Sequence, residues 1–193
     1  RKKEENIKSK VKILVGNSAT ETNFHKDIFQ KLTKYKEQNI EIYCPLSYGN
    51  SSYANEVILN GEKIFGDKFH GITEFMQPEE YTRFLSDIDI AVFYNNRNQA
   101  MGNIALLAYL GCKIYIRNDT VMWSQYVTKG GCKFFSVTDI DKESFESFCK
   151  NEIENVTKIN EVMNDQVFNE NEFIVLRRLY TSSNKFIDLV FHC

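Results

Sequence analysis

The polar segment around Arg97 has the composition of an anion-binding loop. It brings together Arg97, Gln99, Gly102 and Asn103 where a helix-forming stretch begins. Backbone N–H groups at a helix start lack intrahelical partners and the helix dipole is positive there, so both favour a bound anion. Arginine can pair with a diphosphate, and glycine lets the backbone approach it closely. The pattern favours an anion site over the alternative, a helix capped by Asn98 with Gly102 packed against a strand.

Two further segments follow apolar runs and suit a nucleotide ligand. Gly16-Asn17-Ser18-Ala19-Thr20 is small, polar and rich in donors, as a phosphate-binding loop is, although an ordinary turn has the same composition. In the segment Pro45-Leu46-Ser47-Tyr48-Gly49, the tyrosine ring is suited either to stacking on a base or sugar or to packing on the surface. Both segments therefore remain candidates with a structural alternative.

The segment Thr73-Glu74-Phe75-Met76 combines a carboxylate with two apolar side chains. Phe75 and Met76 could form a slot for a flat base, or they could pack in the core at a strand end. Glu74 could bind ribose or sugar hydroxyl groups, although a single glutamate is commonly exposed to solvent. No Ser-His-Asp order and no pair of carboxylates stands out, so no catalytic residue is assigned.

Several well-defined sequence motifs are missing. Neither GxGxxG nor GxxxxGK[ST] follows the first apolar run, which argues against a dinucleotide fingerprint and a P-loop. The five cysteines form no CxxC pair, and the three histidines form no HExxH or HxxxH arrangement. We therefore expect no metal and no cofactor, and we expect the cysteines to be mostly buried free thiols.

Short apolar runs alternate with longer amphipathic segments along most of the chain. We expect strands at about residues 11–15, 40–44, 69–75, 88–93, 113–117 and 132–137. We expect helices near residues 24–32, 51–65, 99–110 and 119–129 and one that starts at Pro78. This order predicts a Rossmann-like α/β fold: a mostly parallel sheet of about six strands with helices on both faces. Ligands of such sheets bind beyond the carboxyl ends of the strands, where all four polar segments fall.

The predicted domain occupies residues 11–140. Residues 1–10 are charged and are expected to be a lead-in or linker, and residues 141–193 read as an acidic helical tail that completes the domain. The residues alone thus indicate an anion-binding or nucleotide-binding α/β domain.

The composition narrows the class of protein. The chain has 24 Lys and Arg residues against 26 Asp and Glu residues, a formal net charge of -2, so no nucleic-acid partner is expected. The hydrophobic fraction of 42% is too high for intrinsic disorder. No apolar run approaches the roughly 18 residues that cross a bilayer, and the first residues lack the apolar core of a signal peptide. We expect a soluble globular chain.

The polar segments also resemble those of a known family. Residues 13–20, 44–49, 73–76 and 96–104 occur in the same order as in the TDP-N-acetylfucosamine:lipid II N-acetylfucosaminyltransferases. These enzymes form the 4-alpha-L-fucosyltransferase family, glycosyltransferase family 56, of enterobacterial common antigen synthesis. The resemblance covers roughly residues 11–137. It implies a GT-B architecture of two facing Rossmann-like domains, of which this chain resembles the C-terminal, donor-binding one.

The resemblance implies a role for each polar segment. Gly16, Asn17 and Ser18 would face the donor diphosphate across the interdomain cleft. Ser47 and Tyr48 would line the nucleotide pocket, and Phe75 with Met76 would hold the base, beside Glu74. The diphosphate and donor sugar would be contacted by the segment that contains Arg97, Asn98, Gln99, Gly102 and Asn103.

The implied reaction is metal-independent transfer of a 6-deoxy amino sugar, of the 4-acetamido-4,6-dideoxygalactose type, from a TDP-sugar. The acceptor would be a polyprenyl-diphosphate-linked saccharide, bound through a missing N-terminal domain that usually also supplies the base. Family members are about twice this length, so this chain alone is expected to bind donor weakly and transfer nothing. The full-length protein is expected to be cytoplasmic and peripheral to the inner membrane.

Two other functions stay open at this stage. One is a non-enzymatic nucleotide-binding or regulatory α/β module with the same anion loops. The other, a flavodoxin-like redox domain, is disfavoured because no aromatic-flanked phosphate loop follows the first strand.

Overall fold

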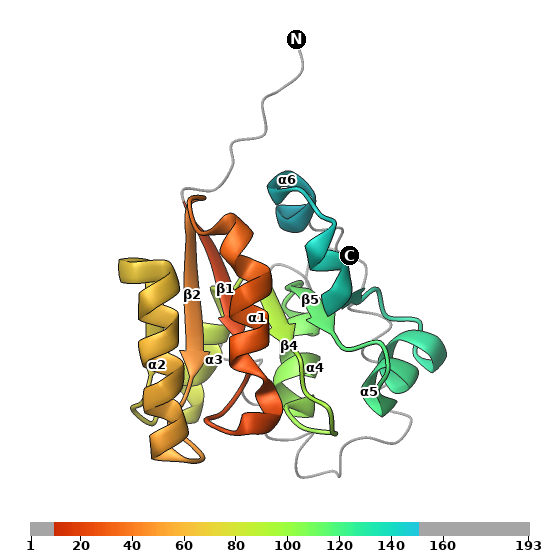
Figure 1. Ribbon diagram of the computed structural model, residues 1–193. Coiled ribbons are helices and arrows are strands. Elements are labelled where there is room, and N and C mark those ends of the chain that lie inside the picture. Colours follow the sequence, from red (N-terminus) through yellow and green to blue (C-terminus); the bar gives the residue numbers. More distant parts are fainter. Residues whose placement is uncertain (1–9, 151–193) are drawn as a thin grey trace.

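Six strands form one sheet in this computed structural model, which describes residues 10–150 (Figure 1). The order across the sheet is β3-β2-β1-β4-β5-β6, and every neighbouring pair is parallel. The strands are β1 (Val11–Val15), β2 (Ile40–Pro45), β3 (Phe69–Ile72), β4 (Ile90–Phe93), β5 (Lys113–Ile116) and β6 (Phe135–Ser136). This confirms the predicted Rossmann-like parallel sheet. The strand order reverses between β1 and β4, which is where such sheets bind ligands.

Helices cover both faces of the sheet, because parallel neighbours need crossover connections. Helices α1 (His25–Leu32) and α2 (Ser51–Phe65) lie in front of the strands in Figure 1. Helices α3 (Pro78–Ser86) and α4 (Met101–Tyr109) lie behind them. Other helices are α5 (Val121–Trp123), which continues as the π-helix η4 (Ser124–Lys129), and α6 (Phe145–Cys149). Short 3₁₀ helices lie at Glu21–Asn23, Thr33–Tyr35, Gly66–Lys68 and Val137–Asp141.

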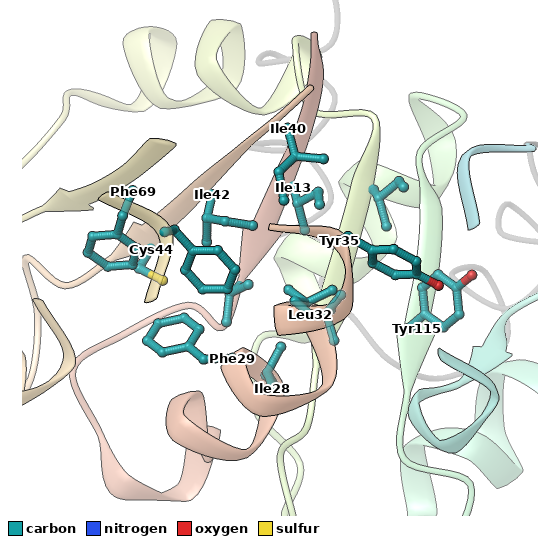
Figure 2. Packing of buried hydrophobic residues seen from close by; sticks show 14 of the residues in the cluster. Ile13, Ile28, Phe29, Leu32, Tyr35, Ile40, Ile42, Cys44, Phe69 and Tyr115 are labelled. Carbon is teal, nitrogen blue, oxygen red and sulfur yellow. The ribbon is translucent and has the colours of Figure 1, made fainter. Parts of the chain in front are cut away.

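The strands are apolar on both sides, so two cores form, one under each helix layer. In β4, Ile90 and Val92 belong to the core under α1, whereas Ala91 and Phe93 belong to the core under α4. Figure 2 shows the front core, where Phe29 and Leu32 of α1 lie against the isoleucines of β1 and β2. Burial of such side chains supplies on the order of 2 kcal/mol each, which fixes α1 on the sheet.

Local sequence signals set the ends of two helices as predicted. Asn50 caps α2, because its side-chain oxygen accepts a hydrogen bond from the Tyr53 N–H at 3.0 Å. The same helix ends at Gly66, which has φ +57°. Pro78 lies in the first turn of α3, where its missing N–H costs no hydrogen bond.

Several element boundaries differ from the prediction, and four of the differences are informative. Strand β3 ends at Ile72, which pairs with Pro45 at the end of β2, so no partner strand continues beyond it. Helix α4 begins at Met101 because Ala100 has a left-handed backbone (φ +60°) that cannot continue a helix. Strand β6 has two residues, which pair with Tyr115 and Ile116 of β5. The helix predicted up to residue 129 is α-helical for three residues and then widens to a π-helix.

Helix α6 lies near the amino ends of the strands, away from the predicted ligand edge (Figure 1). The Lys113 ammonium on β5 donates to the carbonyl oxygens of Ser147 (2.8 Å) and Phe148 (3.2 Å). The Tyr115 hydroxyl donates to the Glu143 carboxylate. These bonds attach the start of the predicted tail to the sheet. The lead-in up to residue 9 and the tail beyond residue 150 lie outside the described residues, so the domain boundaries stay predictions.

Two further properties concern residues 10–150. All four cysteines in this range carry thiols, and Cys44, Cys112 and Cys132 are buried, as expected. No helix in the same range has both the length and the apolar character that crossing a membrane requires.

Candidate functional site

The four predicted loops lie along the edge formed by the carboxyl ends of the strands, at the lower side of the sheet in Figure 1. We call this the carboxyl edge. The Leu46 N–H donates to the Ile72 carbonyl at 2.7 Å, which joins the loops after β2 and β3. The Ala19 N–H donates to the Tyr48 carbonyl at 2.7 Å, which joins the loops after β1 and β2. The loops therefore form a continuous rim, with the β3 loop farthest from β4.

The loop after β1 is held from inside by Asn23, which is completely buried. Its amide nitrogen donates to the Ser18 carbonyl (3.0 Å) and the Thr20 hydroxyl (2.9 Å), and its oxygen accepts from the Asn17 N–H (3.3 Å). One side chain thus satisfies polar groups across the whole loop, so the loop has one preferred shape. Asn23 was not among the site residues predicted from the sequence. The available signal was a polar residue directly before the apolar face of α1.

His25 is a second buried residue that the sequence analysis missed. Its Nδ1 lies 3.3 Å from the Tyr53 hydroxyl, and burial lowers the pKa of the imidazole to about 4, so the ring is neutral at pH 7. Its Nε2 lies directly under Gly16, where a Cβ atom would come within 2.6 Å of it. Gly16 also has φ +67°. Only glycine fits this position without strain.

Gln99 joins the loop after β4 to the loop after β1. Its Oε1 accepts from the Thr22 hydroxyl and from the Arg97 Nε, each at 2.8 Å. Its Nε2 donates to the Asn17 Oδ1 at 3.3 Å. Three predicted site residues, Asn17, Arg97 and Gln99, are therefore in one hydrogen-bonded group at the point where the strand order reverses. Sequence alone had placed Arg97 and Gln99 on one loop and Asn17 on another.

Arg97 and the start of α4 are open toward solvent. The guanidinium takes part in no ion pair within residues 10–150, and its side chain is exposed. Among the described residues, no side chain caps α4, and a Cβ built at Gly102 would meet no atom within 4 Å. The cap position is Ala100, so the alternative with Asn98 as the cap and Gly102 packed against a strand is wrong. The structure leaves a positive charge beside unpaired helix N–H groups.

Asn103 connects α4 to α3. Its amide nitrogen donates to the Tyr81 hydroxyl at 3.0 Å. Burial raises the pKa of Tyr81 to about 12, so this hydroxyl stays protonated. The bond occupies one donor of Asn103, and its predicted contact with the donor sugar stays a prediction.

The residues predicted to hold the nucleoside lie on the surface of the carboxyl edge. Tyr48 is 79% exposed and Phe75 is 75% exposed. Ser47 and Glu74 are also exposed, and Met76 is half-buried. The exposure of Phe75 removes the core-packing alternative for that residue. Exposed aromatic rings beside a concentration of polar loops are suited to stacking on a flat ligand, and this role stays a prediction.

A second arginine lies on the same edge but is already paired. Arg117, directly after β5, donates to both carboxylate oxygens of Asp119 at 2.9 and 2.6 Å. This pairing holds the pKa of the Asp119 carboxyl below its usual value. The guanidinium also lies 5.0 Å from the ring centroid of Tyr94. Its charge is balanced, which distinguishes it from Arg97.

Asn95 follows β4 and is completely buried. Neither its Nδ2 nor its Oδ1 has a hydrogen-bond partner among the described residues. A buried amide in this state weakens the fold.

The chemistry available at the β1 and β4 loops is that of hydrogen-bond donors and one positive charge. Within residues 10–150, no three His, Cys, Asp or Glu side chains come together as a metal-binding group. The arrangement can bind an anion that is rich in acceptor oxygens.

Solved structures with a similar fold include several sugar-processing enzymes. One is a glycosyltransferase from Rickettsia africae, with 13% sequence identity and a TM-score of 0.64. The matched region covers 97% of the present chain and 50% of the Rickettsia chain. An alpha,alpha-trehalose-phosphate synthase (UDP-forming) from Burkholderia vietnamiensis matches 91% and 43%, with 8% identity and a TM-score of 0.62. A putative UDP-N-acetylglucosamine 2-epimerase from Listeria monocytogenes matches 82% and 45%, with 15% identity and a TM-score of 0.51. These likenesses establish the fold, and the chain spans half or less of each structure's length.

Family membership rests on a separate comparison. A family model described as 4-alpha-L-fucosyltransferase glycosyl transferase group 56 matches residues 1–180, which is most of the chain. The match includes every loop of the carboxyl edge. The chain therefore belongs to the 4-alpha-L-fucosyltransferase family, glycosyl transferase group 56.

Proposed function

We propose that this chain is the C-terminal, donor-binding half of a GT-B glycosyltransferase. The enzyme transfers a 6-deoxy amino sugar of the 4-acetamido-4,6-dideoxygalactose type from a TDP-sugar to a polyprenyl-diphosphate-linked saccharide. Membership of glycosyl transferase group 56 supports a sugar-transferase domain. The matched structures are about twice as long as this chain, which supports a second domain facing the carboxyl edge.

One observation carries the proposal. Within residues 10–150, Arg97 has no carboxylate partner, and it directly precedes the start of α4, which no side chain of that range caps, at the reversal of strand order. A diphosphate is the anion that uses both features, because one phosphate can pair with the guanidinium while the other meets helix N–H groups. In sugar transfer the diphosphate is the leaving group. Donors already in place for its developing charge lower the barrier.

The rest of the donor extends along the carboxyl edge in this proposal. Asn17 and Ser18 face the diphosphate beside Gly16. The thymidine lies toward the loops after β2 and β3, where exposed Tyr48 and Phe75 offer ring surfaces. Ser47, Glu74 and Met76 flank them, and Gly102 and Asn103 lie nearest the donor sugar.

The other half of the enzyme binds the acceptor and supplies the base that deprotonates its hydroxyl. The full-length enzyme then works without a metal ion in surface polysaccharide synthesis. It is cytoplasmic and peripheral to the inner membrane, because its acceptor is lipid-linked. The present chain binds donor weakly and transfers nothing unaided.

Calorimetric titration and thermal shift with TDP, UDP, FMN and NAD test the proposal. TDP is expected to raise the melting temperature in proportion to RT ln(1 + [L]/Kd), with a smaller effect of UDP and none of FMN or NAD. Arg97→Ala should weaken TDP binding by at least about tenfold, since it removes a charge-assisted bond. Arg83→Ala, which removes an exposed arginine from α3, is the matched control and should bind TDP normally. A response to FMN without one to TDP or UDP contradicts the proposal.

A further inference from the structure

The direction of the hydrogen bonds around Gln99 is determined by Arg97. A guanidinium has donors and no acceptor, so the amide atom that faces its Nε must be the oxygen of Gln99. The Thr22 hydroxyl reaches the same oxygen at 2.8 Å and must also donate. The amide nitrogen of Gln99 is then the atom that faces Asn17, at 3.3 Å from its Oδ1. Neither amide can be reversed without placing like groups together.

This order fixes which atoms remain for a ligand. With its Oδ1 turned to Gln99, Asn17 directs its NH₂ group away from the amide of Gln99. The proton of Thr22 is committed to Gln99, so in the Thr20–Thr22 pair, at 3.2 Å, Thr20 is the donor. The hydroxyl groups of the β1 loop therefore donate in sequence, from Thr20 to Thr22 and from Thr22 to Gln99. On Arg97, the Nε is engaged by Gln99, so the N–H groups of the two terminal nitrogens are the ones left for a ligand.

We infer that Gln99 is a positioning residue that turns the N–H donors of Asn17 and Arg97 toward a common phosphate group. The inference rests on the proposed function, and it gives Gln99 a role through its neighbours, since both of its polar atoms are engaged by protein. Without Gln99, no hydrogen bond from that residue holds the Asn17 amide with its nitrogen turned toward the ligand. The exposed arginine side chain must then be ordered by the ligand, which weakens binding.

The test is a set of variants titrated with TDP and with inorganic pyrophosphate. Gln99→Met keeps the volume and removes all three side-chain hydrogen bonds of Gln99, and it should weaken binding of both probes on the order of tenfold. Gln99→Glu has acceptors only, so Asn17 must turn its nitrogen inward and its oxygen toward the phosphate, while the carboxylate pairs with Arg97. This variant should bind more weakly than Gln99→Met. Gln30→Met, on the exposed face of α1, is the matched control and should bind as wild type does.

A double-mutant cycle separates positioning from a general structural role. In an Arg97→Ala background, Gln99→Met should cost much less than in wild type, because one of the groups it orients is gone. In NMR spectra without ligand, the Arg97 Nε–H signal should be protected from solvent exchange in wild type and lose that protection in Gln99→Met. Equal losses of affinity in both backgrounds, or Gln99→Glu binding as tightly as wild type, would overturn the inference.

The outcomes distinguish the two proposals. If wild type binds TDP and the Gln99 variants bind it equally well, the inference fails and the proposed function stands. If wild type binds neither TDP nor pyrophosphate, the proposed function fails, and the inference fails with it.

Discussion

Acidification should destabilise this protein through His25. The imidazole is completely buried beneath Gly16, and burial lowers its pKa to about 4 from its ordinary value of 6.5. The unfolded chain therefore takes up a proton near pH 6.5, whereas the folded chain resists it until about pH 4. Stability from the neutral ring is fully present above pH 6.5, and it is lost progressively as the pH falls from 6.5 to 4.

The size of the loss follows from the gap between the two pKa values. A gap of about 2.5 units at about 1.4 kcal/mol each is about 3 kcal/mol, a large share of the stability of a domain of this size. The titratable group in contact with His25 is Tyr53, whose pKa is raised by burial, so it stays neutral throughout this range. The loss is therefore assigned to the imidazole itself.

Urea unfolding of wild type and His25→Asn at several pH values between 4 and 8 measures the effect. The difference in unfolding free energy between the two proteins should be constant above pH 7 and should shrink by about 3 kcal/mol toward pH 4. The constant range above pH 7 is the internal control. A difference that stays the same from pH 8 to pH 4 would refute the assignment, because protonation would then be no harder in the folded state.

Three further outcomes follow from the same geometry. Gly16→Ala should lower the unfolding free energy by about 2 kcal/mol or more in urea titrations, because φ is +67° and the new Cβ would lie 2.6 Å from the His25 ring; an unchanged midpoint contradicts this. Gly102→Ala meets no neighbour, so it should gain about 0.5 kcal/mol of stability while weakening TDP binding in calorimetry; unaltered affinity would remove Gly102 from the site. Asn95→Leu removes an unpaired buried amide and should stabilise by about 1 kcal/mol in thermal melts; a clear loss would show that the amide has a partner.

Much of the fold could be predicted because its signals are local. The signals lie within a few residues of the elements that they specify. Apolar runs mark the strands, Pro78 marks the start of α3, and Gly66 marks the end of α2. Alternating strands and helices then force parallel pairing, and parallel pairing puts all four loops at one edge. The errors lay at element ends, such as Ala100, where a left-handed backbone has no marker in the residue type.

The sequence by itself determined the parallel α/β architecture and which loops share the carboxyl edge, because periodicity and turn chemistry act over short distances. Only the tertiary structure decided what each site residue does. Gln99 meets Asn17 across 82 positions of sequence, and that contact sets the direction of their hydrogen bonds. Arg117 forms an ion pair with the Asp119 carboxylate, whereas Arg97 has no carboxylate partner among the described residues. Partner choice and desolvation depend on distances in space, which residue spacing does not encode.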